Sequence, residues 1–158
     1  MDVRDSANPV VLTAARWLDD VNGRHPWNHN EHFHRWILGN LPAGRQAAVD
    51  VGCGTGVLAG KLARHFARVT GIDADAGMAA AASARLAGDP RVTIARCRFE
   101  EFDQQADAAG QDQDQDQADL ITMVAVLHHL DLDATLARIP QLLAPGGRLL
   151  VVGLAKAD

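Results

Sequence analysis

The stretch Ala47–Gly56 (AAVDVGCGTG) constrains the fold of this chain more than any other. Residues Ala47–Val51 form a short apolar run of the kind that becomes a buried strand. Three glycines then interrupt the run, and Val57–Phe66 follows with apolar residues at helical spacing. A strand, a glycine turn and a helix in this order predict the first unit of a parallel α/β sheet.

A second apolar strand, Arg68–Ile72, ends at Asp73, about twenty residues after the first glycine. Glycines let the backbone approach a ligand closely, and a helix start offers N–H groups without intrahelical partners. The carboxylate at the end of the second strand can accept hydrogen bonds from ribose hydroxyls. The two segments together predict a site for a nucleotide-like ligand.

The spacing of the glycines indicates which nucleotide. Counted from Gly52, the dinucleotide pattern G-x-G-x-x-G needs glycine or alanine where this chain has Val57. The chain has G-x-G-x-G instead, and Asp50 precedes the first glycine by two residues. A nearby carboxylate disfavours a pyrophosphate but favours an α-ammonium group. A nicotinamide-dependent oxidoreductase is therefore the weaker alternative, and the chain has no tyrosine to act as its proton donor.

Here the chain resembles the class I S-adenosylmethionine-dependent methyltransferases. Four segments match that family's motifs in the family's order: Val49–Gly56, Gly71–Asp75, Ala118–Leu130 and Leu142–Gly153. The resemblance implies a doubly wound α/β fold with a parallel sheet of strand order 3-2-1-4-5. It also implies S-adenosyl-L-methionine as cofactor and methyl transfer to an O, N or C nucleophile. The segment Leu127–Leu130 (LHHL) and the absence of a basic surface resemble the small-molecule branch of the family, and the lack of an Asn/Asp-Pro-Pro-Tyr element after the fourth strand argues against methylation of bases or amide nitrogens.

The resemblance also assigns roles to residues of the site. The turn glycines make room for the aminoacyl group, Asp50 anchors it through the turn, and Asp73 holds the ribose hydroxyls. The residues expected to bind the cofactor are Asp50, Gly52, Cys53, Gly54, Gly56, Asp73, Ala74, Arg98, Phe99, Glu100, Val124 and Leu127.

The end of the third strand departs from the family pattern. The family usually places an acid there that accepts from the adenine amino group, whereas this chain has Arg98. Arginine cannot accept a hydrogen bond. Either Glu100 replaces that acid, or the backbone N–H of Phe99 binds the ring alone, or Glu100 and Glu101 are merely solvated.

Two histidines follow the fourth predicted strand, Asp119–Val124. Residues just beyond that strand lie at the carboxyl edge of the sheet, beside the strand that carries the glycine turn. His128 and His129 are therefore candidate catalytic bases, because histidine can take a proton from an acceptor near neutral pH. Two alternatives stay open: the histidines cap or pack under the next helix, or proximity to the sulfonium suffices without a base.

Residues 1–45 are predicted to form a helical cap with helices over 9–21 and 30–38. One interpretation is that these helices pack on the sheet edge, with Trp27 and Trp36 as anchors. The other is a lid over the ligand, for which the candidate residues are Asn28, His32, Phe33 and His34. Metal ligation by the histidines is not expected, because no carboxylate or cysteine completes a ligand set.

The rest of the chain is predicted to complete a single domain whose cofactor-binding core spans residues 46–158. Pro145–Gly147 is predicted to form a turn before the last strand. Asp75 is predicted to cap the helix that begins directly after it, at residue 76. The helix after the histidines should bury one stripe of apolar residues: Leu132, Leu136, Ile139 and Leu143. The expected elements are helices over 76–86 and 131–143 and strands over 91–95 and 148–154.

The segment before the fourth strand has no apolar face to bury. Residues 103–117, rich in Gln and Asp, cannot offset their ordering entropy and are expected to form a flexible surface loop.

The family's sheet normally has two further strands beside strand five, for which this chain of 158 residues has no candidates. The apolar edge of strand five could pair with a second copy in a homodimer. A catalytically weak or inactive module that binds cofactor or partners is thus the alternative to an active enzyme.

Composition sets the remaining expectations. A formal net charge of −5 without a Lys/Arg cluster argues against nucleic acid as the partner. No apolar run approaches the roughly 18 residues that a membrane span needs. Cys53 and Cys97 are not expected to pair, and the lack of an N-terminal apolar segment points to the cytoplasm.

Overall fold

A computed structural model describes residues 29–102 and 117–153 of the chain. The predicted helix over 9–21, Trp27, Asn28 and nearly all of the predicted loop therefore lie outside the described residues. The chain divides into two compact units, residues 1–36 and 37–158. Helix α2 (His29–Gly39) crosses the boundary between them and confirms the helix predicted over 30–38.

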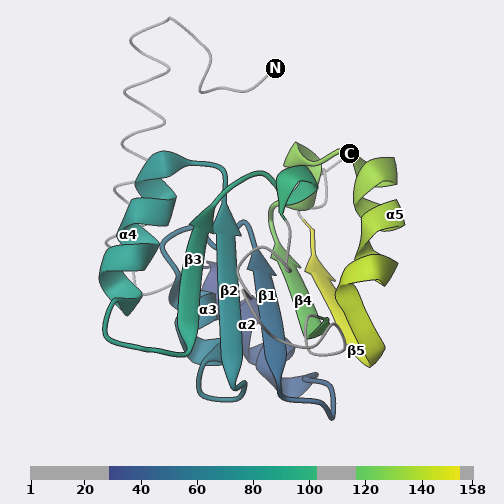
Figure 1. Cartoon of the computed structure of the whole chain (residues 1–158), viewed down its shortest axis with the longest axis horizontal. Coiled ribbons are helices and arrows are strands. Elements are labelled where there is room, and N and C mark those ends of the chain that lie inside the picture. The colour runs from purple at the N-terminus through teal and green to yellow at the C-terminus, as the bar shows by residue number, and fades with distance from the viewer. Residues whose placement is uncertain (1–28, 103–116, 154–158) are drawn as a thin grey trace, which may run out of the picture. The chain divides into compact units, whose positions relative to one another are not determined.

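The second unit is built on five parallel strands in the order β3-β2-β1-β4-β5, as predicted (Figure 1). All five residues of β1 are buried, which explains why the sequence is a continuous apolar run broken only by Asp50. The strands are β1 (Ala47–Val51), β2 (Arg68–Asp73), β3 (Val92–Arg96), β4 (Ala118–Val124) and β5 (Leu143–Val152).

Two helices that follow β1 and β2, α3 (Val57–Leu62) and α4 (Ala76–Leu86), pack closely against each other. A Cβ built at Gly56 would lie 3.1 Å from Cβ of Ala82, and one at Gly60 would lie 2.9 Å from Cδ2 of Leu86. Small residues on both helices permit this approach. Asp75 caps α4 as predicted, because its side chain accepts from the Met78 amide at 2.9 Å.

Helix α3 is shorter than the predicted 57–66. After Leu62, the amides of Arg64 and His65 bond the carbonyls three residues before them, at 3.2 and 2.8 Å. Such tight turns are common at the ends of α-helices. Phe66 still packs in the core and is 3% exposed.

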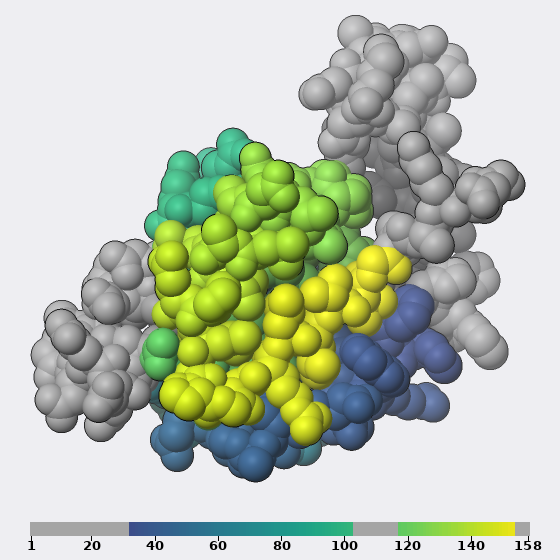
Figure 2. Space-filling view, turned by 90° about the vertical axis from the view of Figure 1, so that its right-hand side faces the viewer, coloured from purple at the N-terminus to yellow at the C-terminus, as the bar shows by residue number. Residues whose placement is uncertain are grey.

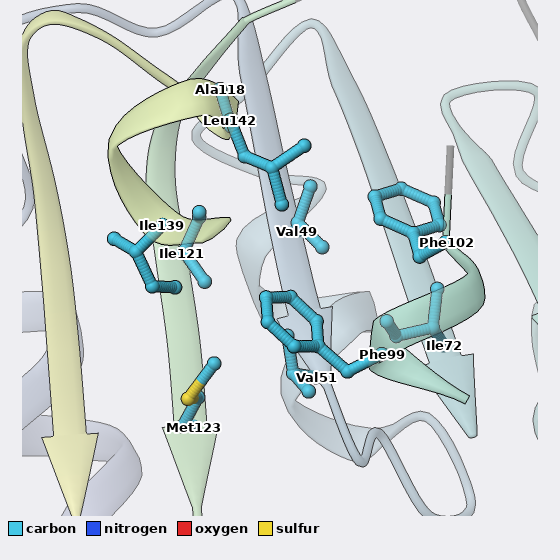
Figure 3. Packing of buried hydrophobic residues seen from close by; sticks show 10 residues of the cluster. All are labelled: Val49, Val51, Ile72, Phe99, Phe102, Ala118, Ile121, Met123, Ile139 and Leu142. Atoms are coloured by element: carbon cyan, nitrogen blue, oxygen red, sulfur yellow. The ribbon is translucent and has the colours of Figure 1, made fainter. Parts of the chain in front are cut away.

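The face of the sheet opposite α3 is covered by α5 (Leu132–Leu142) and the short 3₁₀ helix η2 (Phe99–Glu101), as seen in Figure 3. Figure 3 shows the side chains that fill the space between these helices and the sheet. This cluster contains Val49, Val51, Ile72, Phe99, Phe102, Ala118, Ile121, Met123, Ile139 and Leu142.

The stripe predicted for α5 was wrong in half of its members. Leu132 and Leu136 are 50% and 51% exposed, whereas Thr135, Ile139 and Leu142 face the core. The side chain of Arg138 donates to the carbonyl of Phe102 at the end of η2. This polar contact accompanies the burial of the 135/139/142 side of the helix, and a sequence pattern of leucines does not contain that information.

Strand β5 begins at Leu143, five residues earlier than predicted. The predicted turn at residues 145–147 is an irregularity inside the strand, where the pairing moves from Ala118–Leu143 to Leu120–Arg148. Gly146 has φ 78°, and a Cβ at Gly147 would lie 2.9 Å from the carbonyl oxygen of Ala118. Glycine is required at both positions for these reasons.

One edge of the sheet is formed by β5, which pairs only with β4 among the described strands. Figure 2 shows β5 at the surface beside α5. Helix α5 also presents two exposed leucines, Leu132 and Leu136, at the surface. Within residues 29–102 and 117–153, no helix has the length and apolar character needed to cross a membrane.

Replacing Asp131 by alanine should lower the free energy of unfolding by about 1 kcal/mol. Its side chain caps α5 by accepting from the Ala134 amide at 3.0 Å, and alanine leaves that amide without a partner in the helix. Denaturant unfolding measures the change. Asp131→Asn is the matched control and should lose only a few tenths of that amount; equal stability of the alanine variant and the parent would contradict the assigned cap.

Candidate functional site

The glycine turn after β1 has the backbone that only glycine adopts readily. Gly52, Gly54 and Gly56 have φ values of 68°, 54° and 78°. The amides of Gly52 and Cys53 both donate to the carbonyl of Ile72, at 2.8 and 3.0 Å, so the turn is tied to β2. The pattern G-x-G-x-G is thus explained by local conformation.

The three glycines face different surroundings. A Cβ at Gly52 would lie 2.5 Å from Cγ2 of Val126, and one at Gly56 would lie 2.8 Å from Cδ1 of Leu86. A Cβ at Gly54 would meet no atom of the described residues within 4 Å. The turn is therefore packed on protein at Gly52 and Gly56 and open at Gly54, where a ligand can approach the backbone.

Asp73, at the end of β2, is fixed against this open part of the turn. Its Oδ2 accepts from the Gly54 amide at 2.9 Å, and its Oδ1 accepts from the Asp75 amide at 2.9 Å. Each carboxylate oxygen has capacity for another hydrogen bond. Asp73 can therefore accept from a ligand without giving up its contact with the turn.

Asp50 lies on β1, two residues before the turn, and is 2% exposed. Thr122 donates to Oδ1 at 2.8 Å, whereas Oδ2 has no hydrogen-bond partner among the described residues. The pKa of Asp50 is raised to about 7, mainly by burial and to a smaller extent by the charge of Asp73, although the Thr122 hydroxyl and the Ala59 amide lower it. The site therefore holds a buried acid that changes charge near neutral pH.

Cys53, inside the turn, is a packing residue. Burial raises the pKa of its thiol to about 12, with the charges of Asp50 and Asp73 adding to the effect. Its Sγ would lie 3.0 Å from a Cβ at Gly71, so the thiol fills the space that this glycine leaves. The thiol stays neutral and is not a nucleophile. It forms no disulfide with Cys97.

The residues after β3 form a different environment from the turn. Phe99 is 2% exposed and belongs to the core cluster, so its backbone alone remains for a ligand. Nε of Arg98 lies 3.6 Å from Oε2 of Glu100, and the Arg98 side chain is 67% exposed. No hydrogen bond of good geometry to that Oε2 is found in the described parts of the chain. Contacts of these three residues with adenine remain a prediction.

The chain leaves β4 through a strained residue that the sequence did not reveal. Ala125 has φ 53°, and among the described non-glycine residues it alone has a positive φ. Its amide donates to the carbonyl of Val152 at 2.8 Å. The next residue, Val126, packs against Gly52. Alanine carries no turn signal, so only the three-dimensional structure reveals the unusual backbone at this exit.

His128 and His129 lie in the 3₁₀ helix η4 (Leu127–His129) at the carboxyl edge of the sheet, as predicted. Both side chains are exposed, and their ring centroids are 3.9 Å apart at an interplanar angle of 43°. Exposure leaves the imidazoles open to an incoming molecule. Val124 and Leu127, on either side of the exit, are partly buried.

The predicted lid residues are only partly described. His32 and Phe33 meet edge to face with ring centroids 5.8 Å apart, and His34 is 5% exposed. The described part of the chain contains no group of three or more His, Cys, Asp or Glu side chains placed to hold a metal ion.

An adenosyl ligand with an amino-acid tail fits the open backbone and the hydrogen-bond acceptors of the turn. The open backbone at Gly54 admits a ligand, Asp73 offers acceptors to hydroxyls, and the unpartnered oxygen of Asp50 favours a positive charge nearby. Two carboxylates at the turn disfavour a pyrophosphate. The geometry thus agrees with the ligand class that the glycine spacing indicates.

Comparison with known proteins gives the same result. The family model described as a methyltransferase domain matches residues 49–149. An uncharacterized methyltransferase of Mycobacterium bovis is 36% identical over 128 residues, which cover 80% of this chain and 60% of that protein. A ubiquinone biosynthesis O-methyltransferase of Aromatoleum aromaticum is 30% identical over 152 residues, 91% of this chain and 62% of that protein. The chain thus spans about 60% of the length of these relatives.

Solved structures share the fold. The YcgJ protein of Bacillus subtilis superposes with a TM-score of 0.64 at 22% identity, over 78% of this chain and 50% of that one. The N-methyltransferase NodS of Bradyrhizobium japonicum gives 0.63 at 22% identity, over 80% and 68% of the two chains. With the family match, the strand order and the glycine turn in agreement, the chain belongs to the methyltransferase domain family, in its class I, S-adenosylmethionine-dependent group.

Proposed function

We propose that this chain binds S-adenosylmethionine at the glycine turn and transfers its methyl group to a small-molecule acceptor. The observation that carries the proposal is the pairing of Asp73 with the Gly54 amide, 2.9 Å apart, beside the open space at Gly54. When bound, S-adenosylmethionine supplies an electrophilic methyl group. The O-methyltransferase relative favours a hydroxyl oxygen as the acceptor.

Each residue of the site has a separate task in this proposal. Asp73 accepts from the ribose hydroxyls, and Gly54 leaves room for the aminoacyl group. Asp50 supplies a negative charge beneath the turn. Adenine contacts fall to Glu100 and to the Phe99 amide. The remaining predicted contacts are Gly52, Cys53, Gly56, Ala74, Arg98, Val124 and Leu127.

Binding of the cofactor tests the assignment directly. Asp73→Ala should weaken the affinity for S-adenosylhomocysteine at least tenfold, about 1.4 kcal/mol, measured by calorimetric titration of the full chain. Asp89→Ala is the matched control, because Asp89 is an acid held in an exposed ion pair with Arg91 before β3. It should bind like the parent. A folded parent protein that binds no adenosyl ligand would exclude the proposed cofactor site.

We further propose that one of the two exposed histidines acts as general base for a hydroxyl acceptor. If His128 or His129 takes the acceptor proton, its replacement by alanine should lower kcat by about 100-fold or more. Cofactor affinity should stay unchanged. The measurement is transfer of a labelled methyl group to a panel of hydroxylated small molecules. Full activity of both variants would show that proximity alone suffices.

Three broader expectations belong to this proposal. The net charge of −5 supports a small-molecule acceptor over a nucleic-acid backbone, and two cysteines that form no disulfide support a cytoplasmic location.

The open edge of β5 and the exposed Leu132 and Leu136 support a homodimer. Light scattering with Leu132 and Leu136 both changed to aspartate tests the dimer, which should then dissociate.

The same experiments distinguish the proposed methyltransferase from the alternative, a weak or inactive module. Such a module would bind S-adenosylhomocysteine weakly or serve only to bind a partner, and it would methylate the acceptor panel weakly or not at all. Binding that depends on Asp73, together with transfer to an acceptor, would exclude it.

A further inference from the structure

Thr122 is a buried residue that neither the glycine pattern nor the histidines singled out. It lies on β4 directly opposite Asp50 of β1 in the parallel pairing and is 0% exposed. Its Oγ1 is 2.8 Å from Oδ1 of Asp50 and 3.4 Å from the carbonyl oxygen of Val49. A hydroxyl and a carboxylate in the centre of a sheet are costly unless they bond each other.

The hydroxyl can satisfy only one oxygen of the carboxylate. A threonine side chain has a single proton to donate, and the shorter contact assigns it to Oδ1. Oδ2 has no hydrogen-bond partner in the described residues, although it is fully enclosed. An ionised Asp50, two residues before the turn at Gly52, therefore leaves Oδ2 without a hydrogen bond of good geometry, and the Ala59 amide and the Thr122 hydroxyl are the groups that favour its charge.

We propose that Thr122 is a positioning residue of the cofactor site, which holds Asp50 in its charged form and so raises the affinity for the cationic amino-acid part of the cofactor. This inference rests on the proposed function, because it assumes that the cofactor binds at the glycine turn. Thr122 itself touches neither cofactor nor acceptor, and it acts through Asp50.

Proton binding by Asp50 makes the proposal testable. The groups that act on this carboxyl are Asp73 and Cys53 beside the turn, the Ala59 amide of α3 and the Thr122 hydroxyl. Asp73 disfavours the charge of Asp50, Cys53 is neutral, and the amide and the hydroxyl favour it. Because the hydroxyl lowers the pKa of Asp50 from what burial alone would set, its loss should move proton release to higher pH.

The expected result is a pH-dependent effect of Thr122→Val, which removes the hydroxyl and keeps the shape. Near pH 7, where the pKa of Asp50 lies, the variant should bind S-adenosylhomocysteine several-fold and up to about tenfold more weakly than the parent. Below about pH 7, binding through the carboxylate requires Asp50 to release its proton, and this release costs the variant more because its pKa is higher. At about pH 9 both proteins already hold the carboxylate. The ratio of the two dissociation constants should therefore be largest at and below neutrality and approach one at about pH 9. Titration of the ligand's own amino group cancels in this ratio.

Two further variants separate positioning from packing. Thr122→Ser restores a hydroxyl and should return the ratio toward one at every pH. In an Asp50→Asn background, Thr122→Val should change the affinity by the same factor at all pH values, because no proton remains to be released. Calorimetric titration of each full chain measures the constants, and thermal unfolding verifies that each variant is folded.

The outcomes distinguish this inference from the function on which it rests. A folded parent that binds no S-adenosylhomocysteine overturns the proposed function. A parent that binds it, with Thr122→Val weaker by a constant factor from about pH 5 to 9 or not weaker at all, overturns the positioning role alone. Failure of serine to rescue binding counts against it as well.

Discussion

Replacing Gly54 by alanine is expected to weaken binding of S-adenosylhomocysteine by about 100-fold while the protein stays folded. The new Cβ would enter the open space at the turn, where the cofactor must approach the backbone. Because Gly54 has φ 54°, alanine adds a conformational cost of about 1 to 2 kcal/mol, which a native domain tolerates. Calorimetric titration measures the loss of affinity, and denaturant unfolding measures the cost to stability.

Two other glycines provide matched controls. Gly52→Ala would place a Cβ 2.5 Å from Val126, so this variant should lose more stability than Gly54→Ala, about 3 kcal/mol or more. Gly88 has no atom within 4 Å of a built Cβ and no positive φ, so Gly88→Ala should affect neither property. If Gly54→Ala binds S-adenosylhomocysteine like the parent, the cofactor does not approach the turn at its open glycine.

The second large effect concerns stability. Asp50→Asn should stabilise the cofactor-free protein above about pH 7 by a free energy on the order of 3 kcal/mol. Burial raises the pKa of Asp50 to about 7, so ionisation in the folded state costs far more than in the unfolded chain. Asparagine keeps an oxygen that accepts from Thr122 and carries no charge.

The sign of the pH dependence follows from proton binding. Between about pH 4 and 7 the folded protein retains the Asp50 proton and the unfolded chain has lost it, so the parent loses stability as pH rises. Above about 7 both states are ionised and this contribution is constant. The stability difference between Asp50→Asn and the parent should therefore grow from about pH 4 to 7 and then level off. Denaturant unfolding across this range measures it, and a difference independent of pH would contradict the raised pKa.

The part of the site that could be predicted from the sequence is the part with local signatures. Gly52, Gly54 and Gly56 need positive φ, and Asp73 follows at the spacing that a strand, a turn and a helix impose. The strand order came with the family resemblance carried by these motifs. Such features depend on residues close together in the chain, so a sequence displays them.

Val124 and Leu127 were predicted to reach the site from β4, but the contacts that β4 and its exit make there could not be predicted in this way. Thr122 contacts Asp50, and Val126 contacts Gly52, only because β4 pairs with β1 across more than seventy residues of chain. Ala125 has an unusual backbone that its residue type disguises. The inward face of α5 was misjudged for a related reason, since the sheet and the η2 residues against which Thr135, Ile139 and Leu142 pack come from other parts of the chain.

The pairing of β1 with β4 also has a consequence for dividing the protein. Phe102 and Gln117 bound a segment between the two groups of elements that build the site: the turn, Asp50 and Asp73 come before it, and Thr122 and Val126 come after it. A chain cut within that segment would yield two fragments, neither of which carries a complete site. Cofactor and fragment association would then be thermodynamically linked, so that occupancy of the turn reports the reunion of the two pieces.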